Sequence, residues 1–446
     1  MNRMIRALVF TASVKQIVAA AHNDTSSTSS SYVVSTTPTS SVDYQCLHKN
    51  NWIIESHYNS IFKTMTGPQS LTYSASQEQS TVAFSSIVNY ERAFTAADIA
   101  ELNSRPSAST DFKSGATTAV AGHTYEFGAN IGYLSDACAL GYWPAGPVCP
   151  TSTTYTQSYP TQPKAETSSS GCFTSFTYPL AILVNGEMMY SWSDANTYLS
   201  YGYWHNLAAS FEQYDFDVCS GHSAMGIYHC HAYPNCLAES LGDDGSGHSP
   251  VYGFAIDGYP IYGPYQSKGV LAKSCFAKRD YSKTSPTGCS DGARSCVLKT
   301  IYDYSQGTTT LYSKYSGPSL TGNVTTQSDH TISAASGIYF EDYYYDSSCY
   351  KGLGTADDYT LNQNNGHDHD GLGFHYHATV DSSMTPTFPY SAGPKFYGCI
   401  ANSVAIDEMS GKTSTPACWA SYTGSGSGKS TCASSSYGTS STSCSN

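Results

Sequence analysis

Charged residues are scarce in this chain, and positive charge is the scarcer kind. Only 12% of its 446 residues are charged, and 21 Lys and Arg stand against 34 Asp and Glu, which gives a formal net charge of −13. The Lys and Arg residues form no basic stripe along the sequence. Nucleic acids and anionic lipids bind to concentrated positive charge, so we expect neither as a partner.

Long apolar runs are missing as well. After the first 21 residues no stretch approaches the roughly 20 apolar residues of a membrane-spanning helix, so the sequence predicts no membrane span. The first 21 residues carry two arginines, then a moderately apolar run, and end in Ala19-Ala20-Ala21, the small-residue pattern that precedes a signal-peptidase cut. Lys15 interrupts the run, which leaves a mitochondrial presequence as the alternative.

Cysteine, by contrast, is plentiful. Fifteen cysteines are spread over the chain, and N-glycosylation sequons begin at Asn23 and Asn323. Because disulfides persist in oxidising compartments, these features and the N-terminal segment predict a secreted extracellular glycoprotein with disulfide bonds and matrix or glycan partners. An odd count leaves at least one cysteine without an intramolecular partner, for which we expect Cys432 or Cys444, while we expect Cys230 in a disulfide.

The composition favours strands and turns over helices. The chain has 38 Tyr and 37 Gly with many Ser and Thr, which form strands and turns. We therefore predict a mainly β, disulfide-stabilised fold with long irregular loops. Short strands are expected at residues 52–54 and 81–84, and one helix at 93–104, capped by Thr95. The predicted order is a signal peptide (1–21), a Ser/Thr-rich flexible leader (22–43), an N-terminal β-rich region (44–175), a duplicated core (176–400) and a Gly/Ser-rich tail (401–446).

Two similar segments predict the duplication. Residues 181–190 and 255–262 each read as an apolar strand, an Asn-Gly or Asp-Gly step and an aromatic strand. Such steps between apolar runs are the strongest short hairpin signals. Each segment is followed by a histidine motif, so we predict two copies of a hairpin-plus-histidine unit, with an insertion at about 266–346 in the second. A pseudo-twofold arrangement in which the two histidine motifs meet is one expected outcome.

The histidine motifs are the candidate functional sites. Half of the 14 histidines lie within residues 219–236 and 365–378, which share a Gly-His pair followed by a His-x-His-Ala run. Alternation along a strand puts residues i and i+2 on one face, so each His-x-His pair offers two imidazoles to one ion. Such sites suit zinc, copper, nickel or iron. The candidate ligands are His222, His229, His231, His367, His369, His375 and His377, and the alternative is a buried polar network.

Several aspartates accompany these histidines. We expect Asp217 and Asp257 to hold ring nitrogens in one tautomer, although Asp in a turn also commonly caps its own backbone. Asp368 and Asp370 add oxygen donors to the second motif. If the site is catalytic, Asp257, Asp368 and Asp370 are the candidates for a base that activates metal-bound water.

The motifs resemble a known family. Asp217-Val-Cys-Ser-Gly-His222 running into Tyr228-His-Cys-His-Ala232, then residues 253–264, and finally Phe374-His-Tyr-His-Ala378 with 388–390 are similar to the YHYH domain of secreted proteins. The resemblance covers about residues 176–400. Cys230 and Phe374 replace one tyrosine each of the eponymous tetrapeptide, and no histidine is lost. The resemblance implies the domain and an extracellular location rather than a reaction.

Three functions remain open from the sequence. The leading expectation is a secreted protein that binds copper or zinc ions through the His-x-His strands. The first alternative is an extracellular metalloenzyme, either a metal-assisted hydrolase or a copper oxidoreductase, which requires an open coordination position. The second is a Tyr-rich matrix or cell-surface structural protein. The substrate, the disulfide pairing and the oligomeric state stay undetermined at this stage.

Overall fold

The structure is a computed structural model of the chain. It describes residues 42, 44–52, 70–75, 79–86, 90–106, 119–127, 153–160, 163, 165, 179–224, 226–284, 287–297, 309–352 and 359–398. All of these belong to one compact unit, Ser40–Asn446. The predicted signal peptide, nearly all of the predicted leader, the Gly/Ser-rich tail, Asn23, Cys432 and Cys444 lie outside the described residues.

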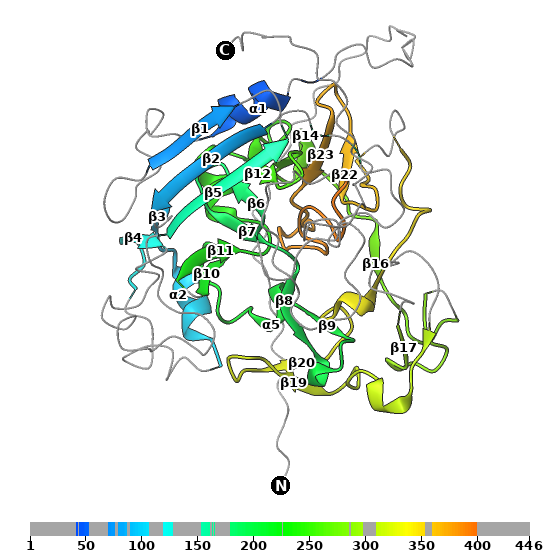
Figure 1. The fold of residues 1–446 in the computed structure, drawn as a ribbon. Coiled ribbons are helices and arrows are strands. Elements are labelled where there is room, and N and C mark those ends of the chain that lie inside the picture. The colour runs from blue at the N-terminus through cyan, green and yellow to red at the C-terminus, as the bar shows by residue number, and fades with distance from the viewer. Residues whose placement is uncertain are drawn as a thin grey trace, which may run out of the picture. The chain divides into compact units, whose positions relative to one another are not determined.

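An eight-stranded mixed sheet forms the centre of the described fold (Figure 1), and its strand order is β10-β11-β7-β6-β12-β13-β23-β22. The left half of this order consists of β10 (Gly221–Ala224), β11 (Ile227–Cys230), β7 (Met188–Tyr190) and β6 (Pro179–Leu183). The right half consists of β12 (Val251–Ala255), β13 (Pro260–Tyr262), β23 (Phe374–His377) and β22 (Gly366–Asp368). Every residue of β6 and β12 is buried, as their continuous apolar sequence requires.

The two halves of this sheet repeat each other. In each half a hairpin is joined by a parallel strand, which in turn pairs with an antiparallel edge strand. The halves meet at β6 and β12, where Phe254 pairs with Ile182 and the flanking pairs on both sides are equivalent. This is the register expected if a pseudo-twofold axis passes through the Phe254–Ile182 pair. The predicted duplication of a hairpin-plus-histidine unit therefore matches the topology.

Both hairpins turn where the sequence predicts. In the first turn Asn185 Oδ1 accepts the backbone N–H of Glu187, and in the second Asp257 Oδ1 accepts that of Tyr259. The glycines that follow, Gly186 and Gly258, have φ of 87° and 92°, which glycine adopts without steric cost. The Asn-Gly and Asp-Gly steps thus fix the register of the strands that lead to the histidines.

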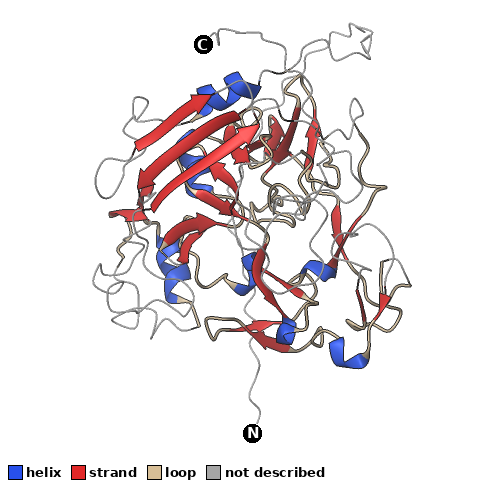
Figure 2. Cartoon of the chain, in the orientation of Figure 1, coloured by secondary structure: helices blue, strands red, loops and turns tan. Residues whose placement is uncertain are grey.

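A smaller three-stranded sheet lies in the N-terminal part. It contains β1 (Ser70–Ala75), β2 (Gln79–Ser86) and β5 (Thr153–Pro160), and β3 (Tyr90–Ala93) pairs with β4 (Thr124–Phe127). Figure 2 shows that strands predominate over helices. The strand predicted at 81–84 lies in β2. The predicted helix is α2 (Ala96–Asn103), which Thr95 caps through a reciprocal pair of bonds with Asp98.

The strand predicted at residues 52–54 is not observed at its first residue. Trp52 directly follows the helix α1 (Tyr44–Asn51), and residues 53 and 54 lie outside the described part. The Trp52 ring packs against Phe254 of the central sheet, with ring centroids 5.2 Å apart. His48 Nε2 contacts the carbonyl oxygen of Gly258 at 2.8 Å. Tertiary packing on the sheet, which the local sequence does not reveal, therefore holds this helix.

Short elements cover the rest of the described chain. The helical ones are η2 (Tyr198–Ser200), α5 (Ala208–Phe211), α6 (Asn235–Leu241), η3 (Ser313–Tyr315) and η4 (Phe340–Asp342). The strand pairs are β8 (Ser193–Thr197) with β9 (His205–Leu207), β14 (Tyr265–Ser267) with β15 (Val270–Leu271), β16 (Phe276–Lys278) with β21 (Tyr343–Tyr345), β17 (Cys296–Val297) with β18 (Thr309–Thr310), and β19 (Asn323–Thr325) with β20 (Thr331–Ser333).

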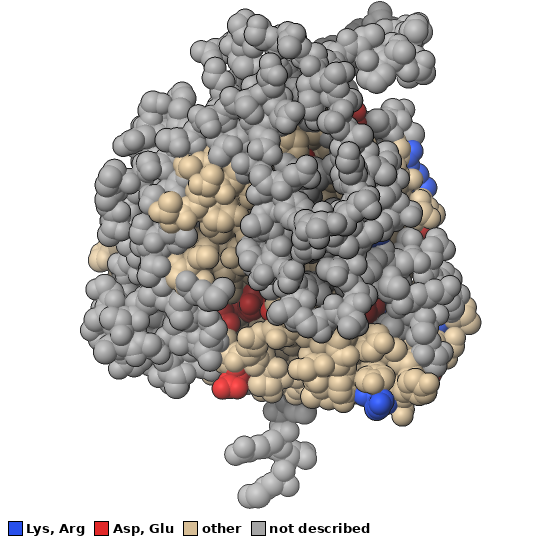
Figure 3. All heavy atoms as spheres, in the orientation of Figure 1, with Lys and Arg blue, Asp and Glu red and all other residues tan. Residues whose placement is uncertain are grey.

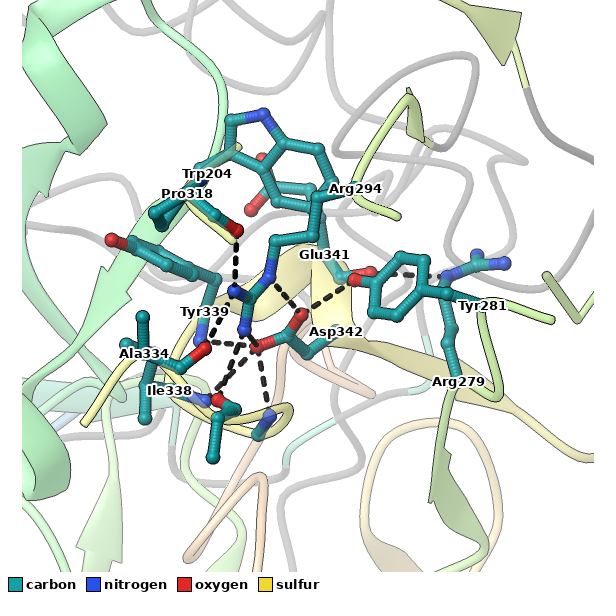
Figure 4. Close-up of polar contacts among 12 residues, drawn as sticks. Trp204, Arg279, Tyr281, Arg294, Pro318, Ala334, Ile338, Tyr339, Glu341 and Asp342 are labelled. Carbon is teal, nitrogen blue, oxygen red and sulfur yellow. Dashed lines mark hydrogen bonds and ion pairs between the residues drawn. The ribbon is translucent and has the colours of Figure 1, made fainter. Parts of the chain in front are cut away.

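The predicted insertion has its own buried polar centre, which Figure 4 shows. Arg294 Nε donates to Asp342 Oδ1 at 2.8 Å, and one of its terminal nitrogens donates to Asp342 Oδ2 at 2.9 Å. Asp342 Oδ2 also accepts the backbone N–H groups of Gly337, Ile338 and Tyr339. A buried charge is tolerated only when it is paired in this way, so this pair organises the loops around it.

Three disulfides are present among the described residues. They join Cys219 to Cys236, Cys275 to Cys349, and Cys289 to Cys296. The prediction that Cys230 forms a disulfide is wrong, because its buried thiol is free and lies 3.9 Å from the carbonyl oxygen of Met188. Burial, with Glu187 nearby, raises the pKa of this thiol. Its neighbours in the sheet core include no second cysteine at bonding distance.

No helix in the described part of the chain is long and apolar enough to cross a membrane. On the face that Figure 3 presents, the described Lys and Arg residues are few and scattered, which agrees with the absence of a basic stripe in the sequence.

Candidate metal centres

Three histidines at one edge of the central sheet point their rings at one another. His222 lies on β10, His229 lies opposite it on β11, and His231 follows β11 directly. The Nε2 atom of His229 is 3.0 Å from that of His222 and 3.1 Å from that of His231. All three residues are buried, and their ligand atoms lie within 4.8 Å of one another. We call these residues the first cluster.

Backbone carbonyls hold two of these rings. His229 Nδ1 lies 3.0 Å from the carbonyl oxygen of Ile227, and His231 Nδ1 lies 2.6 Å from that of Ser191. Because a carbonyl oxygen only accepts, each Nδ1 must carry the proton, and each neutral ring then presents a lone pair at Nε2. The two Nε2 atoms that approach each other are therefore both electron-pair donors. This is the arrangement that a metal ion requires of imidazole ligands.

The surroundings keep these imidazoles neutral. Burial, reinforced by the other histidines of the cluster, lowers the pKa of His222 well below its ordinary value. Burial lowers the pKa of His229 to about 3, with a further contribution from His231, and that of His231 to about 4. An unprotonated Nε2 is the form of histidine that binds metals.

A carboxylate, Glu212, completes the first cluster. Its Oε2 atom lies 3.2 Å from His231 Nε2 and 3.6 Å from His222 Nε2, and it is buried without a hydrogen-bond partner. Burial, with Asp194 and Asp215 nearby, raises the pKa of Glu212 well above its ordinary value. Glu212 is the C-terminal cap of α5, where its backbone N–H bonds to the carbonyl oxygen of Ala208 at 2.8 Å.

The glycine before each motif has a steric role. A Cβ atom on Gly221 would lie 2.5 Å from the ring of Tyr228, and one on Gly366 would lie 2.5 Å from the ring of Phe374. Gly221 and Gly366 hold equivalent positions in the two halves of the sheet, as do the two aromatic residues. The repeated Gly-His pair therefore exists because the aromatic residue before each His-x-His run packs directly over the glycine.

The second cluster lies at the opposite edge of the sheet. His367 on β22 faces His375 on β23, and the Nε2 atoms of His367 and His377 are 3.1 Å apart. His369 adds a fourth ring, whose centroid is 4.4 Å from that of His367 and 5.1 Å from that of His375. A fifth ring, His248, lies with its centroid 5.2 Å from that of His369. We call these five residues the second cluster.

Carbonyls orient the second cluster as they do the first. His375 Nδ1 lies 2.7 Å from the carbonyl oxygen of Gly373, and His377 Nδ1 lies 2.7 Å from that of Gly263. The carbonyls at the equivalent positions in the first half are those of Ile227 and Ser191. Burial lowers the pKa of both His375 and His377 well below the ordinary value. Two copies of one ring-holding arrangement thus present Nε2 lone pairs inward.

His248 was not predicted from the sequence. Its Nδ1 lies 2.7 Å from the carbonyl oxygen of Ser249, so its neutral ring also presents an Nε2 lone pair, and that atom is buried without a hydrogen-bond partner. With His369, His375 and His377 it forms a group whose ligand atoms all lie within 4.8 Å. The sequence offered only a lone Gly-His pair here, and Glu212 stood outside any motif, so neither carried a local signal.

Of the two roles predicted for Asp217 and Asp257, the structure shows the backbone cap, since each accepts a nearby backbone N–H, and not the hold on a histidine ring nitrogen. Asp217 accepts the hydroxyl of Tyr228 at 2.6 Å and the backbone N–H groups of Cys219 and Gly221. Asp257 accepts the hydroxyl of Tyr376 at 2.6 Å. Both therefore hold the tyrosines on the opposite face of the strands, while carbonyls hold the ring nitrogens.

The two remaining predicted aspartates differ in their surroundings. Asp368 alternates with His367 on β22 and acts electrostatically on Tyr44 and Tyr259. Asp370 Oδ2 lies 3.2 Å from His369 Nδ1, and its side chain is 73% exposed. The catalytic role considered for Asp257, Asp368 and Asp370 stays a hypothesis.

The two clusters form separate sites. β11 and β23 are five strand spacings apart in the order of the sheet, which amounts to roughly 24 Å at about 4.8 Å a spacing. No described residue belongs to both groups of ligand atoms. The sequence left open whether the two histidine motifs form one site or two, and the structure keeps them apart, because the pseudo-twofold axis passes between the two hairpins and the motifs lie towards opposite edges of the sheet.

Comparison with known proteins finds a family match for part of the chain. Residues 156–339 match the model of a family described as YHYH protein. The match contains the first cluster and His248 and ends before β22 and β23. No curated protein and no solved structure matches the chain.

Proposed function

We propose that this chain, whose residues 156–339 carry the YHYH region, is an extracellular transition-metal-binding protein that holds copper or zinc ions at the two histidine clusters. The YHYH region contains the first cluster and His248, and the other residues of the second cluster lie beyond it. The proposal concerns binding, and no reaction is assigned to either cluster.

One observation carries the proposal. His229 and His231 each direct an Nε2 lone pair at the other across 3.1 Å, because both Nδ1 protons are used by carbonyls. A buried polar network would place a donor against an acceptor at this distance, as buried groups normally do. A single cation between the rings accepts both lone pairs at once. The Nδ1–carbonyl contacts recur at His375 and His377, and the close Nε2 pair in the second cluster is His367 with His377, 3.1 Å apart.

The donor set and its burial fit copper or zinc. Imidazole suits both ions, and the Nδ1–H···O=C bonds supply the outer contacts that fix ring orientation and tautomer in such sites. The rigid strand positions of the ligands favour a preformed centre. The residues present can therefore hold the ion without rearrangement of the sheet.

The extracellular location is supported by the disulfides. Three are present among the described residues, and one of them, Cys219–Cys236, brackets the first histidine motif. Disulfides of this density are typical of oxidising compartments. Asn323, the acceptor of the second sequon, is exposed on β19, as glycosylation requires.

Elemental analysis tests the proposal. The full chain is expressed through the secretory route of an oxidising host, and bound metals are measured in the folded protein and in a variant with His229, His231, His375 and His377 changed to Ala. We expect stoichiometric copper or zinc in the wild type and none in the folded variant. His123→Ala, which removes an exposed histidine outside both clusters, is the matched control. Metal-free wild type after incubation with both ions would refute the proposal.

A further inference from the structure

We propose that the two clusters are chemically different metal centres: a zinc centre in which Glu212 is a ligand beside three imidazoles, and a copper centre made of imidazoles alone that His248 completes. This inference rests on the proposed function, because it assumes that both clusters bind metal. It goes beyond the duplication, which by itself predicts two equal sites.

The position of Glu212 is that of a ligand. Four donors around a zinc ion at about 2.0–2.1 Å form a tetrahedron with edges of roughly 3.3 Å. The Nε2 atoms of the first cluster are 3.0 and 3.1 Å apart along two edges, and Glu212 Oε2 adds edges of 3.2 Å to His231 and 3.6 Å to His222. A carboxylate that acted only on bound water would lie farther from the ring nitrogens.

The Oε2 atom has no other partner. It is buried and accepts no hydrogen bond. The atom that it approaches most closely, His231 Nε2, carries a lone pair in the neutral ring because its Nδ1 donates to the carbonyl oxygen of Ser191. When Glu212 is ionised, its oxygen is repelled by this lone pair unless a cation lies between the two atoms. A divalent ion satisfies both atoms.

The charge around the first cluster favours a dication. Asp194 and Asp215 lie close enough to Glu212 to act on it electrostatically. Glu212 therefore has two further acidic side chains near it. Zinc binds carboxylate oxygen together with imidazole in four-coordinate sites, so this donor set and charge suit Zn²⁺.

The second cluster differs in its donors. His248, His369, His375 and His377 supply four imidazoles whose ligand atoms lie within 4.8 Å of one another. The Nε2 atoms of His248 and His375 are buried without hydrogen-bond partners, as is His369 Nε2. Asp370, the carboxylate beside this cluster, contacts His369 Nδ1 and is largely exposed. A nitrogen-only set of this kind favours copper over zinc more strongly than a set that includes carboxylate.

The sheet explains how one duplication produced two centres. The paired strands supply equivalent histidines in both halves, including His367 beside His377 in the second, but the further donors come from outside the strands. Glu212 comes from the end of α5, and His248 comes from the segment between α6 and β12. The end of α5 and the segment before β12 are not copies of each other. The metal preference of each centre is therefore set by the segment that supplies Glu212 or His248 rather than by the strands.

Single-centre variants of the full chain test the inference. His375→Ala with His377→Ala leaves the first centre, and His229→Ala with His231→Ala leaves the second. Affinities for Zn²⁺ and Cu²⁺ are measured for each variant by competition with a chelator. Copper binds tighter than zinc at most sites, so the decisive quantity is the ratio of the two affinities. We expect this ratio to be about 100-fold larger at the second centre.

Point variants assign the fourth donors. In the first-centre variant, Glu212→Gln keeps the size of the side chain, and we expect it to weaken Zn²⁺ binding by at least about 10-fold, whereas Glu239→Gln, which changes an exposed glutamate on α6, leaves it unchanged. In the second-centre variant, His248→Ala weakens Cu²⁺ binding, and electron paramagnetic resonance of bound Cu²⁺ reports the loss of one coordinating nitrogen. Circular dichroism confirms that each variant is folded.

The outcomes separate the two proposals. Equal affinity ratios at the two centres, or an unchanged Zn²⁺ affinity in Glu212→Gln, overturns the inference while metal binding itself stands. Absence of metal binding in both single-centre variants and in the wild type overturns the proposed function. A first centre that takes Zn²⁺ with Glu212 and a second that takes Cu²⁺ with His248 supports both.

Discussion

The imidazoles of His229 and His231 stand with their Nε2 atoms 3.1 Å apart, although the proton of each ring is directed away, to a carbonyl oxygen. The sheet imposes this arrangement, since the two residues alternate along one extended segment and project to the same face. Without a cation the two lone pairs oppose each other, and the folded state carries that cost. Binding of the proposed metal ion would relieve this cost and so stabilise the folded state.

Removal of metal should lower stability. An ion that binds only the folded state stabilises it by about 2.7 kcal/mol when its free concentration is 100 times Kd. We expect chelator treatment to lower the midpoint of urea unfolding under non-reducing conditions and added metal to restore it. The variant without His229, His231, His375 and His377 should show no response to either treatment. If neither chelator nor added metal changes the wild-type urea midpoint, metal binding does not stabilise the fold.

Substitution of the glycine before the first motif should destabilise the sheet. In Gly221→Ala the new Cβ would lie 2.5 Å from the Tyr228 ring, which cannot withdraw because its hydroxyl is bound to Asp217. Overpacking of this kind costs about 1–3 kcal/mol. Thermal unfolding should show the loss, while Gly247→Ala, where a Cβ meets nothing within 4 Å, should unfold as the wild type does. Equal stability of both variants would show that Tyr228 can move.

Loss of the buried arginine should destabilise the insertion. Arg294→Met leaves Asp342 buried without its bidentate partner, and breaking such a pair costs about 3–5 kcal/mol. Lys283→Met, which removes an exposed positive charge, is the control and should change stability little. Denaturant titration measures both. An Arg294→Met protein as stable as the control would mean that the backbone N–H groups and the Tyr281 hydroxyl together satisfy the carboxylate.

Much of the central sheet is predictable because its signals are local. Asn185-Gly186 and Asp257-Gly258 determine tight turns, and alternation along β11 and β23 determines which side chains share a face. Repetition of these signals predicts the duplication. Whether the histidine motifs meet is decided by strand order, which depends on long-range pairing, so the sequence leaves the question open and only the structure answers it.

The residues that prediction missed depend on tertiary structure. Glu212 reaches the first cluster because α5 ends beside it, and His248 reaches the second because the segment before β12 folds over β23. Neither has a partner at a fixed spacing in sequence. Strand alternation turns Cys230 away from the histidines and so favours a disulfide for it, whereas the sheet buries its free thiol at the position equivalent to Tyr376.

Metal binding at the first centre should resist acid more than an exposed histidine site does. Burial lowers the pKa of His229 to about 3 and that of His231 to about 4, so protons do not compete for these rings above about pH 5. For two imidazoles of ordinary pKa near 6.5, a change from pH 7.5 to 5.5 weakens binding by about 100-fold. We expect a change of less than about 5-fold from these rings.

The measurement uses the Glu212→Gln variant in the first-centre background. Burial raises the pKa of Glu212, so its carboxyl group takes up a proton as the pH falls and would add a pH dependence of its own. In this variant Zn²⁺ affinity is followed by chelator competition from pH 7.5 to 5.5. The metal-free protein should also lose stability as the pH falls below about 6.5. In this range the histidines take up protons in the unfolded state but stay neutral in the folded state, where their pKa values are lower. A steep 100-fold fall in affinity would show that the rings are exposed to solvent in solution.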